Sequence, residues 1–434
     1  MAKTYRPYCP DQMFLLPPSL RDWLPENHLV YFVNDVIDQL DLSKIESVYE
    51  RDDRGQPPYN PQMMTKILVY AYCIGVFSSR KIQKRLIEDV AFRVLAAGNQ
   101  PDFRTISDFR KIHLDSLQDL FEQVLKLALT AGAIKLGRVA LDGSKVKANA
   151  SKHKAMSYKR MKEDERKLRD EVQQLLKQAK AADDEEDARY GKDKNGDELP
   201  EDLSRRETRI QKIKEAKRAL EQRAREEAKK SEGSKDSAEK TVPEDKAQYN
   251  FTDPESRIMK GADGFVQAFN AQVVVEDSCQ LIVAQAVTQE ANDKKQTLPM
   301  VEAINEQAGQ TPAQLLADNG YCSDENLKLL EKKPIDVYIA AGRQKHREKP
   351  VRCKRGPLPH GATIVEKMRR KLQTKAGAAV YAARKAIVEP VFGQIKQARG
   401  FRQFLLRGIR KVRGEWALVC ATHNILKMYR LCYA

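Results

Sequence analysis

The chain has 434 residues, of which 41% are hydrophobic and 32% are charged, so it can bury one or more cores beneath a polar surface. Its longest clearly apolar run, 67–77, is too short to span a bilayer, and the start MAKTYRPYCPDQ has no apolar run behind a basic region. The seven cysteines form no CxxC pair, which argues against a disulfide framework and a zinc site. We therefore expect a cytoplasmic protein without a membrane partner.

Positive charge is concentrated in one part of the chain. The formal net charge is +16, and residues 343–413 contain 21 Lys and Arg residues against three acids. A solvated basic surface is the simple explanation, and a polyanionic partner is the functional one. One of the three acids is Glu389, which lies among Arg384, Lys385 and Lys396. A single carboxylate among Arg and Lys residues that could bind phosphate favours a functional role for this segment over a merely solvated surface.

The first part of the chain, 1–135, is expected to be an all-α domain. Its patterns predict helices over 61–77, from Ser78 or Ser79 to about Leu95, and from about 105 to 131. Basic residues lie near the start of the second helix, an arrangement that resembles a helix-turn-helix and predicts DNA binding. An ordinary helical bundle fits the same pattern.

Residues 151–250 have a different composition, with about half of the positions charged and almost no aromatic side chains. Helical patterns cover 158–182 and 203–230. Ile210, Ile213 and Leu220 follow helical spacing and would form a thin apolar seam. We predict a charged helical hairpin inserted into a larger domain.

The remaining segments, 136–150 and 251–434, have the pattern of an α/β domain. Expected elements, in chain order, are strands at 138–142, 265–275 and 281–287, a helix at 294–307, a strand at 314–318, a helix at 323–332, a strand at 336–340, and helices at 377–399 and 416–431. This is the order of an RNase H-like domain, interrupted after its first strand by the charged hairpin. The predicted fold class is therefore α/β, with an all-α domain in front.

Three carboxylates fall on elements that such a fold brings together. Asp142 is expected to end a buried apolar strand, where an unpaired charge is costly, and Asp318 holds the equivalent place on the fourth strand. Glu389 lies on a long basic helix. Cleavage of a phosphodiester needs an activated attacking oxygen and a stabilised leaving oxygen, and two divalent ions held by carboxylates provide both. Taken singly, each residue has an ordinary explanation: a turn aspartate for Asp142 and Asp318, and a helical ion pair with Lys385 for Glu389.

The motifs around these residues resemble those of bacterial insertion-sequence transposases of the DDE superfamily, in the branch with a tyrosine-arginine-glutamate-lysine signature. LDGSKVKANAS surrounds Asp142, ADNGY contains Asp318, and YAARKAIVEPVFGQIK contains Glu389. TDPESRIMK (252–260) and TQEANDKKQTLPM (288–300) are also similar to family segments, and the insert matches least.

The resemblance implies roles for residues of this chain. Asp142, Asp318 and Glu389 would be catalytic and would hold two Mg²⁺ or Mn²⁺ ions. The third motif would be supplied by Tyr381, Arg384, Glu389 and Lys396. Arg384 lies five residues before Glu389, whereas the family pattern has four, so Lys385 is an alternative to it. Lys396 lies seven residues after Glu389, two α-helical turns on, and would share its face. DNA phosphates would be contacted by Lys145, Lys147, Tyr381, Arg384, Lys385, Lys396 and Arg399.

The implied activity is metal-dependent cleavage of double-stranded DNA at the terminal repeats of an element, followed by attack of the freed 3′-hydroxyl on target DNA. A homo-oligomer, dimeric or larger on DNA and associated with the nucleoid, is expected from the resemblance. An RNase H-like nuclease or resolvase that cuts without joining is the alternative enzyme. A domesticated DNA-binding protein without catalysis is the alternative from another class.

Overall fold

The computed structural model describes residues 19–49, 57–190, 201–231, 242–261, 264–342, 356 and 359–433. The chain divides into two compact units. One unit combines Met1–Val146 with Asn270–Ala434, and the other is Lys147–Phe269. The second unit is longer than the predicted insert of 151–250, because short strands on either side of the helical hairpin fold with it.

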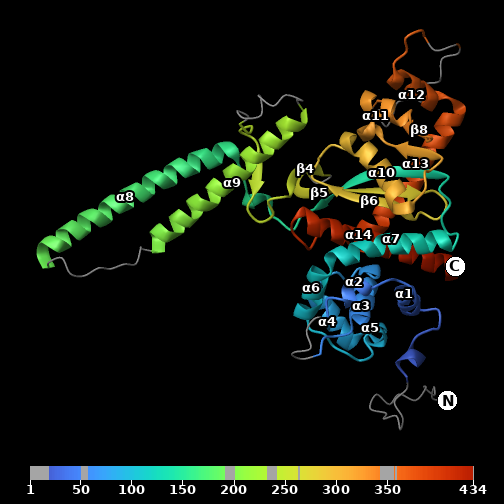
Figure 1. Ribbon diagram of the computed structural model, residues 1–434, viewed down its shortest axis with the longest axis horizontal. Coiled ribbons are helices and arrows are strands. Elements are labelled where there is room, and N and C mark those ends of the chain that lie inside the picture. Colours follow the sequence, from blue (N-terminus) through green and yellow to red (C-terminus); the bar gives the residue numbers. More distant parts are fainter. Residues whose placement is uncertain are drawn as a thin grey trace, which may run out of the picture. The chain divides into compact units, whose positions relative to one another are not determined.

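The first part of the larger unit is helical (Figure 1). Its elements are η1 (Leu20–Trp23), α1 (Leu29–Asp38), α2 (Ser43–Glu46), α3 (Pro61–Cys73), α4 (Ser79–Glu88), α5 (Val90–Leu95), α6 (Phe103–Ile112) and α7 (Leu114–Thr130). Asn60 caps α3 by accepting a hydrogen bond from the Met63 amide at 2.9 Å. The predicted second helix is two helices, because Asp89 has an extended backbone and caps α5 through the Ala91 amide. The predicted third helix is likewise divided, at His113.

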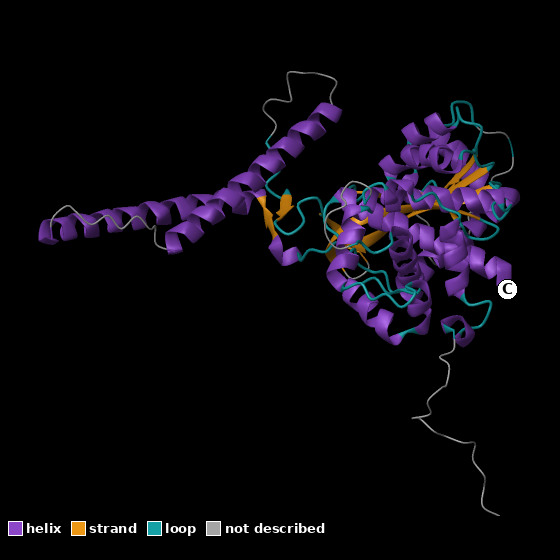
Figure 2. Ribbon diagram, turned by 60° about the horizontal axis from the view of Figure 1, so that its bottom comes forward, coloured by secondary structure: helices purple, strands orange, loops and turns teal. Residues whose placement is uncertain are grey.

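A mixed sheet forms the centre of the α/β part, shown in orange in Figure 2. Its strands are β1 (Arg138–Lys147), β4 (Arg257–Gly261), β5 (Gly264–Glu276), β6 (Ile282–Thr288), β7 (Gln314–Ala317) and β8 (Asp336–Ile339). Among the described residues, the strand order is β4-β5-β1-β7-β8, and β6 also pairs with β5. β1, β7 and β8 are parallel, with Leu141 opposite Ala317, whereas β5 and β6 are antiparallel.

Helices pack against this sheet and connect its strands. They are η4 (Lys294–Gln296), α10 (Thr297–Ala308), η5 (Asn319–Tyr321), α11 (Asp324–Leu330), α12 (Ile364–Gln373), α13 (Lys375–Gly393), the π-helix η6 (Gln394–Ala398) and α14 (Ile409–Tyr433). α14 contacts α7 and α3 of the helical part and β6 of the sheet, so one helix joins both cores. Trp416 on α14 is fully buried.

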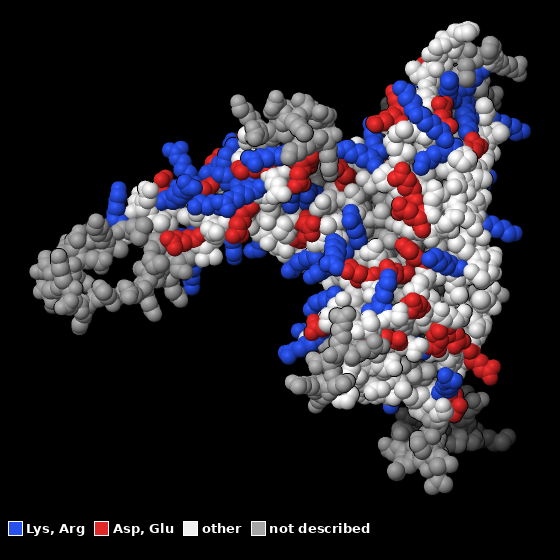
Figure 3. Space-filling model, in the orientation of Figure 1, with Lys and Arg blue, Asp and Glu red and all other residues white. Residues whose placement is uncertain are grey.

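The smaller unit contains η2 (Lys152–Lys154), β2 (Ala155–Ser157), α8 (Tyr158–Tyr190), α9 (Glu201–Ser231), β3 (Gln248–Asn250), β4 and the first part of β5. α8 and α9 are packed helices, as Figure 1 shows. Their shared core includes Met161, Ile210, Ile213 and Leu220. Lysines and arginines gather along this hairpin on the face shown in Figure 3.

The predicted fold class is confirmed: an all-α region precedes a mixed α/β domain with the strand order of an RNase H-like sheet, and a helical insert follows its first strand. The first strand is longer than expected. Asp142 does not end it, because β1 continues to Lys147 and buries Val146. No helix in the described ranges is both long and apolar enough to cross a bilayer.

Candidate active site

Asp142 and Asp318 lie at neighbouring positions on two parallel strands. Leu141 pairs with Ala317, so the next residues are Asp142, still on β1, and Asp318, which directly follows β7. Asp318 Oδ1 accepts a hydrogen bond from the Gly320 amide at 2.7 Å, and Asp142 Oδ1 accepts one from the Gly143 amide at 2.8 Å. The pKa of Asp142 is raised to about 6, chiefly by burial and also by the charge of Asp318, against the opposing effect of Arg384. The fold thus holds two acidic groups close enough for their charges to interact.

Arg384 on α13 points at this pair. Its Nη1 donates to Asp142 Oδ2 at 3.2 Å, and its Nη2 lies 3.8 Å from Glu389 Oε1. Lys385, the alternative at the closer spacing, is exposed. The structure therefore places Arg384, and not Lys385, against the aspartates. Tyr381 lies one turn earlier on the same helix, and burial raises the pKa of its hydroxyl.

Glu389 is oriented differently from the aspartates. Its side chain is 56% exposed, compared with 21% for Asp142, and Arg384 is its ion-pair partner. Asp142 and Glu389 are therefore linked through one guanidinium group. Among the described residues, no group of three His, Cys, Asp or Glu side chains lies close enough to hold a metal ion.

Lys396 contacts β1, the strand that carries both Asp142 and Lys145. Lys396 Nζ donates to Ser144 Oγ and, at 3.1 Å, to the Lys145 carbonyl. Burial lowers the pKa of Lys396, and the nearby charge of Lys145 lowers it further. Lys147 lies at the end of β1 and is exposed.

The residues between Glu389 and Lys396 do not form one regular α-helix. The chain changes to a π-helix at Gln394, where the Arg399 amide bonds to the Gln394 carbonyl at 3.0 Å. Lys396 is half-buried, whereas the Glu389 side chain is 56% exposed. That the two residues share one face stays a prediction.

Arg399 is also placed differently from the prediction. Its guanidinium is buried and donates to Thr422 Oγ1 at 2.8 Å and to the Val419 carbonyl at 3.1 Å, both on α14. Burial lowers its pKa to about 10. Because these contacts tie η6 to α14, we remove Arg399 from the predicted DNA-contacting residues.

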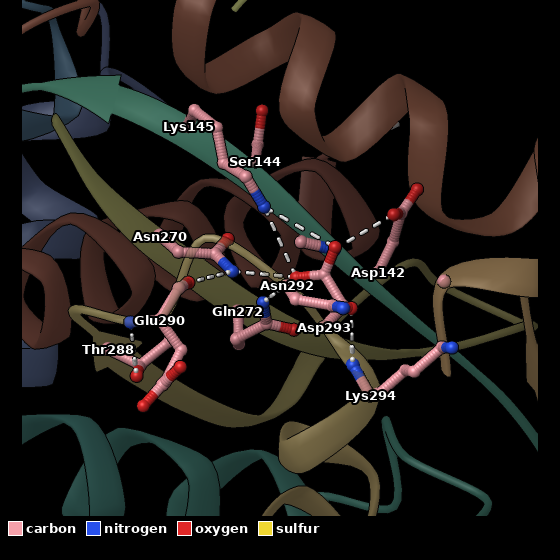
Figure 4. Close-up of polar contacts among 12 residues, drawn as sticks. Asp142, Ser144, Lys145, Asn270, Gln272, Thr288, Glu290, Asn292, Asp293 and Lys294 are labelled. Carbon is pink, nitrogen blue, oxygen red and sulfur yellow. Dashed lines mark hydrogen bonds and ion pairs between the residues drawn. The ribbon is translucent and has the colours of Figure 1, made fainter. Parts of the chain in front are cut away.

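The sequence analysis missed Asp293, which follows β6 beside the candidate site. Figure 4 shows Lys145, Asn270 and Gln272 converging on its carboxylate. A signal was present in the sequence, since Asn270 and Gln272 interrupt an otherwise apolar strand and share one face of it. Buried amides need polar partners. The pattern did not show which residue supplies them.

Divalent ions fit part of this arrangement. Asp142 and Asp318 supply hard oxygen atoms, and the raised pKa of Asp142 shows that the fold does not fully compensate its negative charge. A divalent cation would compensate it. Glu389 does not join the pair in this structure, but its exposed side chain has room to change rotamer.

Two family models match the chain. A model described as a transposase domain (DUF772) matches residues 18–112, which hold the helices from η1 to α6. A model described as a transposase DDE domain matches residues 352–429, which contain Tyr381, Arg384, Glu389 and Lys396. These matches support an insertion-sequence transposase of the DDE superfamily. The resemblance recognised in the motifs is thereby confirmed. Searches of curated proteins and of solved structures found no match.

Proposed function

We propose that this DNA transposase cuts the ends of its element and joins them to target DNA at the site formed by Asp142, Asp318 and Glu389. The observation that carries the proposal is the adjacent placement of Asp142 and Asp318 on parallel strands, with Arg384 and Lys396 of the DDE-matched segment turned toward β1. Metal-dependent cleavage of DNA needs carboxylates that hold the metal ions, beside Arg or Lys side chains that bind phosphate.

The residues of the chain have distinct tasks in this proposal. Asp142 and Asp318 would hold divalent ions, Mg²⁺ or Mn²⁺, with Glu389 as the third ligand after a rotamer change. These ions would supply Lewis-acid stabilisation of charge on the phosphate oxygens. In the present arrangement Arg384 forms ion pairs with Asp142 and Glu389. If these carboxylates bind metal ions instead, Arg384 would be free to donate to a DNA phosphate.

DNA binding would also use the basic surface of the helical region. Arg80, Lys81 and Lys84 are exposed on α4, the helix that was predicted to follow the turn of a helix-turn-helix. Lys145, Lys147, Tyr381 and Lys396 remain predicted contacts to DNA at the site, and Lys385 remains one on the exposed face of α13. Because such contacts neutralise phosphates, binding should weaken strongly as salt concentration rises.

The direct test is an assay with purified protein, Mg²⁺ and a plasmid that carries the gene's own flanking DNA. We expect cuts at discrete ends and joined products from the wild type, and neither from Asp142→Ala. Cuts without joined products would favour a nuclease or resolvase. Binding without chemistry in either Mg²⁺ or Mn²⁺ would favour a DNA-binding remnant and contradict the proposal.

A further inference from the structure

The carboxylate of Asp293 is held from two sides. Its Oδ1 accepts hydrogen bonds from Asn270 Nδ2 at 2.6 Å and from Gln272 Nε2 at 2.8 Å. Lys145 Nζ lies 3.3 Å from both oxygens of the carboxylate (Figure 4). Asp293 is the N-cap residue of η4, but its side chain makes no capping hydrogen bond and contacts this cluster instead. We call Asp293, Lys145, Asn270, Gln272 and Tyr321 the Asp293 cluster.

The two amides fix Asp293 independently of the lysine. Asn270 and Gln272 are fully buried on β5, and the Tyr321 hydroxyl in turn donates to Gln272 Oε1. Their bonds to Asp293 have ordinary lengths. The contacts from Lys145 are longer than the 2.7–2.9 Å typical of charge-assisted hydrogen bonds. An ammonium has three N–H donors, so Lys145 is oriented by the carboxylate and keeps donor capacity for another anion.

The cluster lies against the backbone of Gly143 and Gly320, close in sequence to both aspartates. A side chain at Gly143 would overlap Gln272 and come within 2.9 Å of Asp293 Oδ1. One at Gly320 would come within 2.9 Å of Asp318 Oδ1 and 3.5 Å of Asp293 Oδ2. Burial raises the pKa of Tyr321, and the charges of Asp293, Asp142 and Asp318 raise it further, so all three carboxylates act on this hydroxyl.

The negative charge of Asp293 balances the positive charge of nearby lysines. The Lys145 side chain is only 16% exposed, and Lys396 donates to the Lys145 carbonyl beside it. Two partly buried lysines side by side repel each other. Asp293 provides the negative charge that offsets the ammonium of Lys145, which lies three residues after Asp142 on β1.

We propose that Asp293 is a positioning residue for DNA cleavage, which holds the Lys145 ammonium where it donates to a backbone phosphate of the strand bound at Asp142 and Asp318. The proposal rests on the proposed function. Asp293 touches neither the DNA nor the reacting atoms in it, and acts through Lys145.

The test compares Asp293→Asn, Lys145→Met and the double variant with the wild type. Single-turnover cleavage is measured at saturating protein with Mg²⁺, and the dissociation constant for the same DNA duplex is measured in EDTA. We expect each single variant to lower the cleavage rate roughly 10- to 100-fold, because a misplaced contact of about 1 Å has an effect of this size. The dissociation constant should change by less than about threefold, since most phosphate contacts remain.

The double variant distinguishes positioning from two independent effects. If Asp293 acts through Lys145, the double variant should be no slower than Lys145→Met alone. Glu290→Gln is the matched control, because Glu290 is an exposed carboxylate on the same loop, and it should leave the rate unchanged. The double variant removes both charges of the pair, so it leaves no unpaired lysine. It therefore provides a folded protein for comparison if Asp293→Asn alone proves unstable.

Several results would overturn the inference. An unchanged rate for Asp293→Asn, single effects that multiply in the double variant, or a parallel loss of melting temperature, DNA affinity and rate would each show that Asp293 does not act through Lys145. If the wild type cuts no DNA, the proposed function fails as well. A wild type that cuts beside an equally active Asp293→Asn would refute this inference alone.

Discussion

The ionised form of Asp142 is disfavoured by its own surroundings. Its pKa rises from the ordinary value of 3.8 to about 6, first because burial removes water and then because Asp318 is nearby. Between these two pH values the folded chain binds a proton that the unfolded chain has released. The contribution of this group to the free energy of unfolding therefore falls as pH rises through this window, and stays low above it.

Replacing this carboxylate should stabilise the metal-free protein. We expect Asp142→Asn to raise the free energy of unfolding by roughly 1–3 kcal/mol at pH 7.5 in EDTA, because it removes a buried charge, with Arg384 offsetting part of the gain. The difference should disappear below about pH 4, and chemical denaturation at several pH values measures it.

Added Mg²⁺ should make the wild type more stable than Asp142→Asn. It should raise the melting temperature of the wild type, because binding to the folded state alone is stabilising, and have little effect on Asp142→Asn. An equal response of the two proteins to Mg²⁺ would show that Asp142 is not a metal ligand, whatever the activity of either protein.

At the scale of elements, the hairpin of α8 and α9 depends on a narrow core. Ile213 is 1% exposed, and the residues around it come from these two helices. Glu165 is buried beside this core and accepts from Lys217 at 2.7 Å. Such a thin seam leaves few other contacts to compensate for a lost side chain.

Shortening Ile213 should therefore open the hairpin locally. We expect Ile213→Ala to cost about 2–4 kcal/mol and to speed amide hydrogen exchange throughout α8 and α9, with exchange in β1 and β7 unchanged. Lys212→Ala, at the exposed neighbouring position, is the control. Faster exchange across the sheet as well would mean that the two compact units unfold together.

The elements that the sequence predicted are those with a strong local pattern. The order of the main strands and helices and the apolar seam of the hairpin follow from periodicity and nearby residues. The adjacency of Asp142 and Asp318 followed from strand order, because parallel neighbouring strands present equivalent positions at the same edge.

The features that were missed depend on contacts between distant segments. Asp293 and Lys145 are 148 residues apart in the sequence, and nothing local to either residue indicates the other. At the π-turn, the Arg399 amide bonds to the carbonyl of Gln394, five residues earlier, where an α-helix would use the residue four earlier. The spacing of residues in the sequence does not reveal this difference. Arg399 looked like its basic neighbours, and only the packing of α14 shows that it is buried.

At the scale of the whole molecule, a buried polar network joins the helical region to the α/β domain. Glu415 on α14 is 1% exposed; it accepts from the Tyr72 hydroxyl at 3.3 Å and from the Leu405 and Leu406 amides at 3.0 and 3.1 Å. Arg110, also buried, donates to the Tyr72 hydroxyl at 3.1 Å. Removing one member would take a buried hydrogen-bond partner from its neighbours.

We therefore expect Glu415→Ala to destabilise the larger unit by about 3 kcal/mol or more, because a buried guanidinium and several donors lose their compensation. Glu415→Gln should cost less, since it keeps an acceptor. Glu306→Ala, at an exposed position on α10, is the control. Denaturant unfolding measures all three, and a loss below about 1 kcal/mol for Glu415→Ala would contradict this account.

The position of α14 in the chain affects how the protein is made. Its contacts with α3 and α7 belong to the core of the helical region, yet the ribosome synthesises α14 only after the sheet and the hairpin. The helical region of a nascent chain therefore lacks part of its core until translation has passed the catalytic domain. Chains that stop early should accumulate as degradation substrates and not as folded fragments able to occupy DNA ends without cutting them.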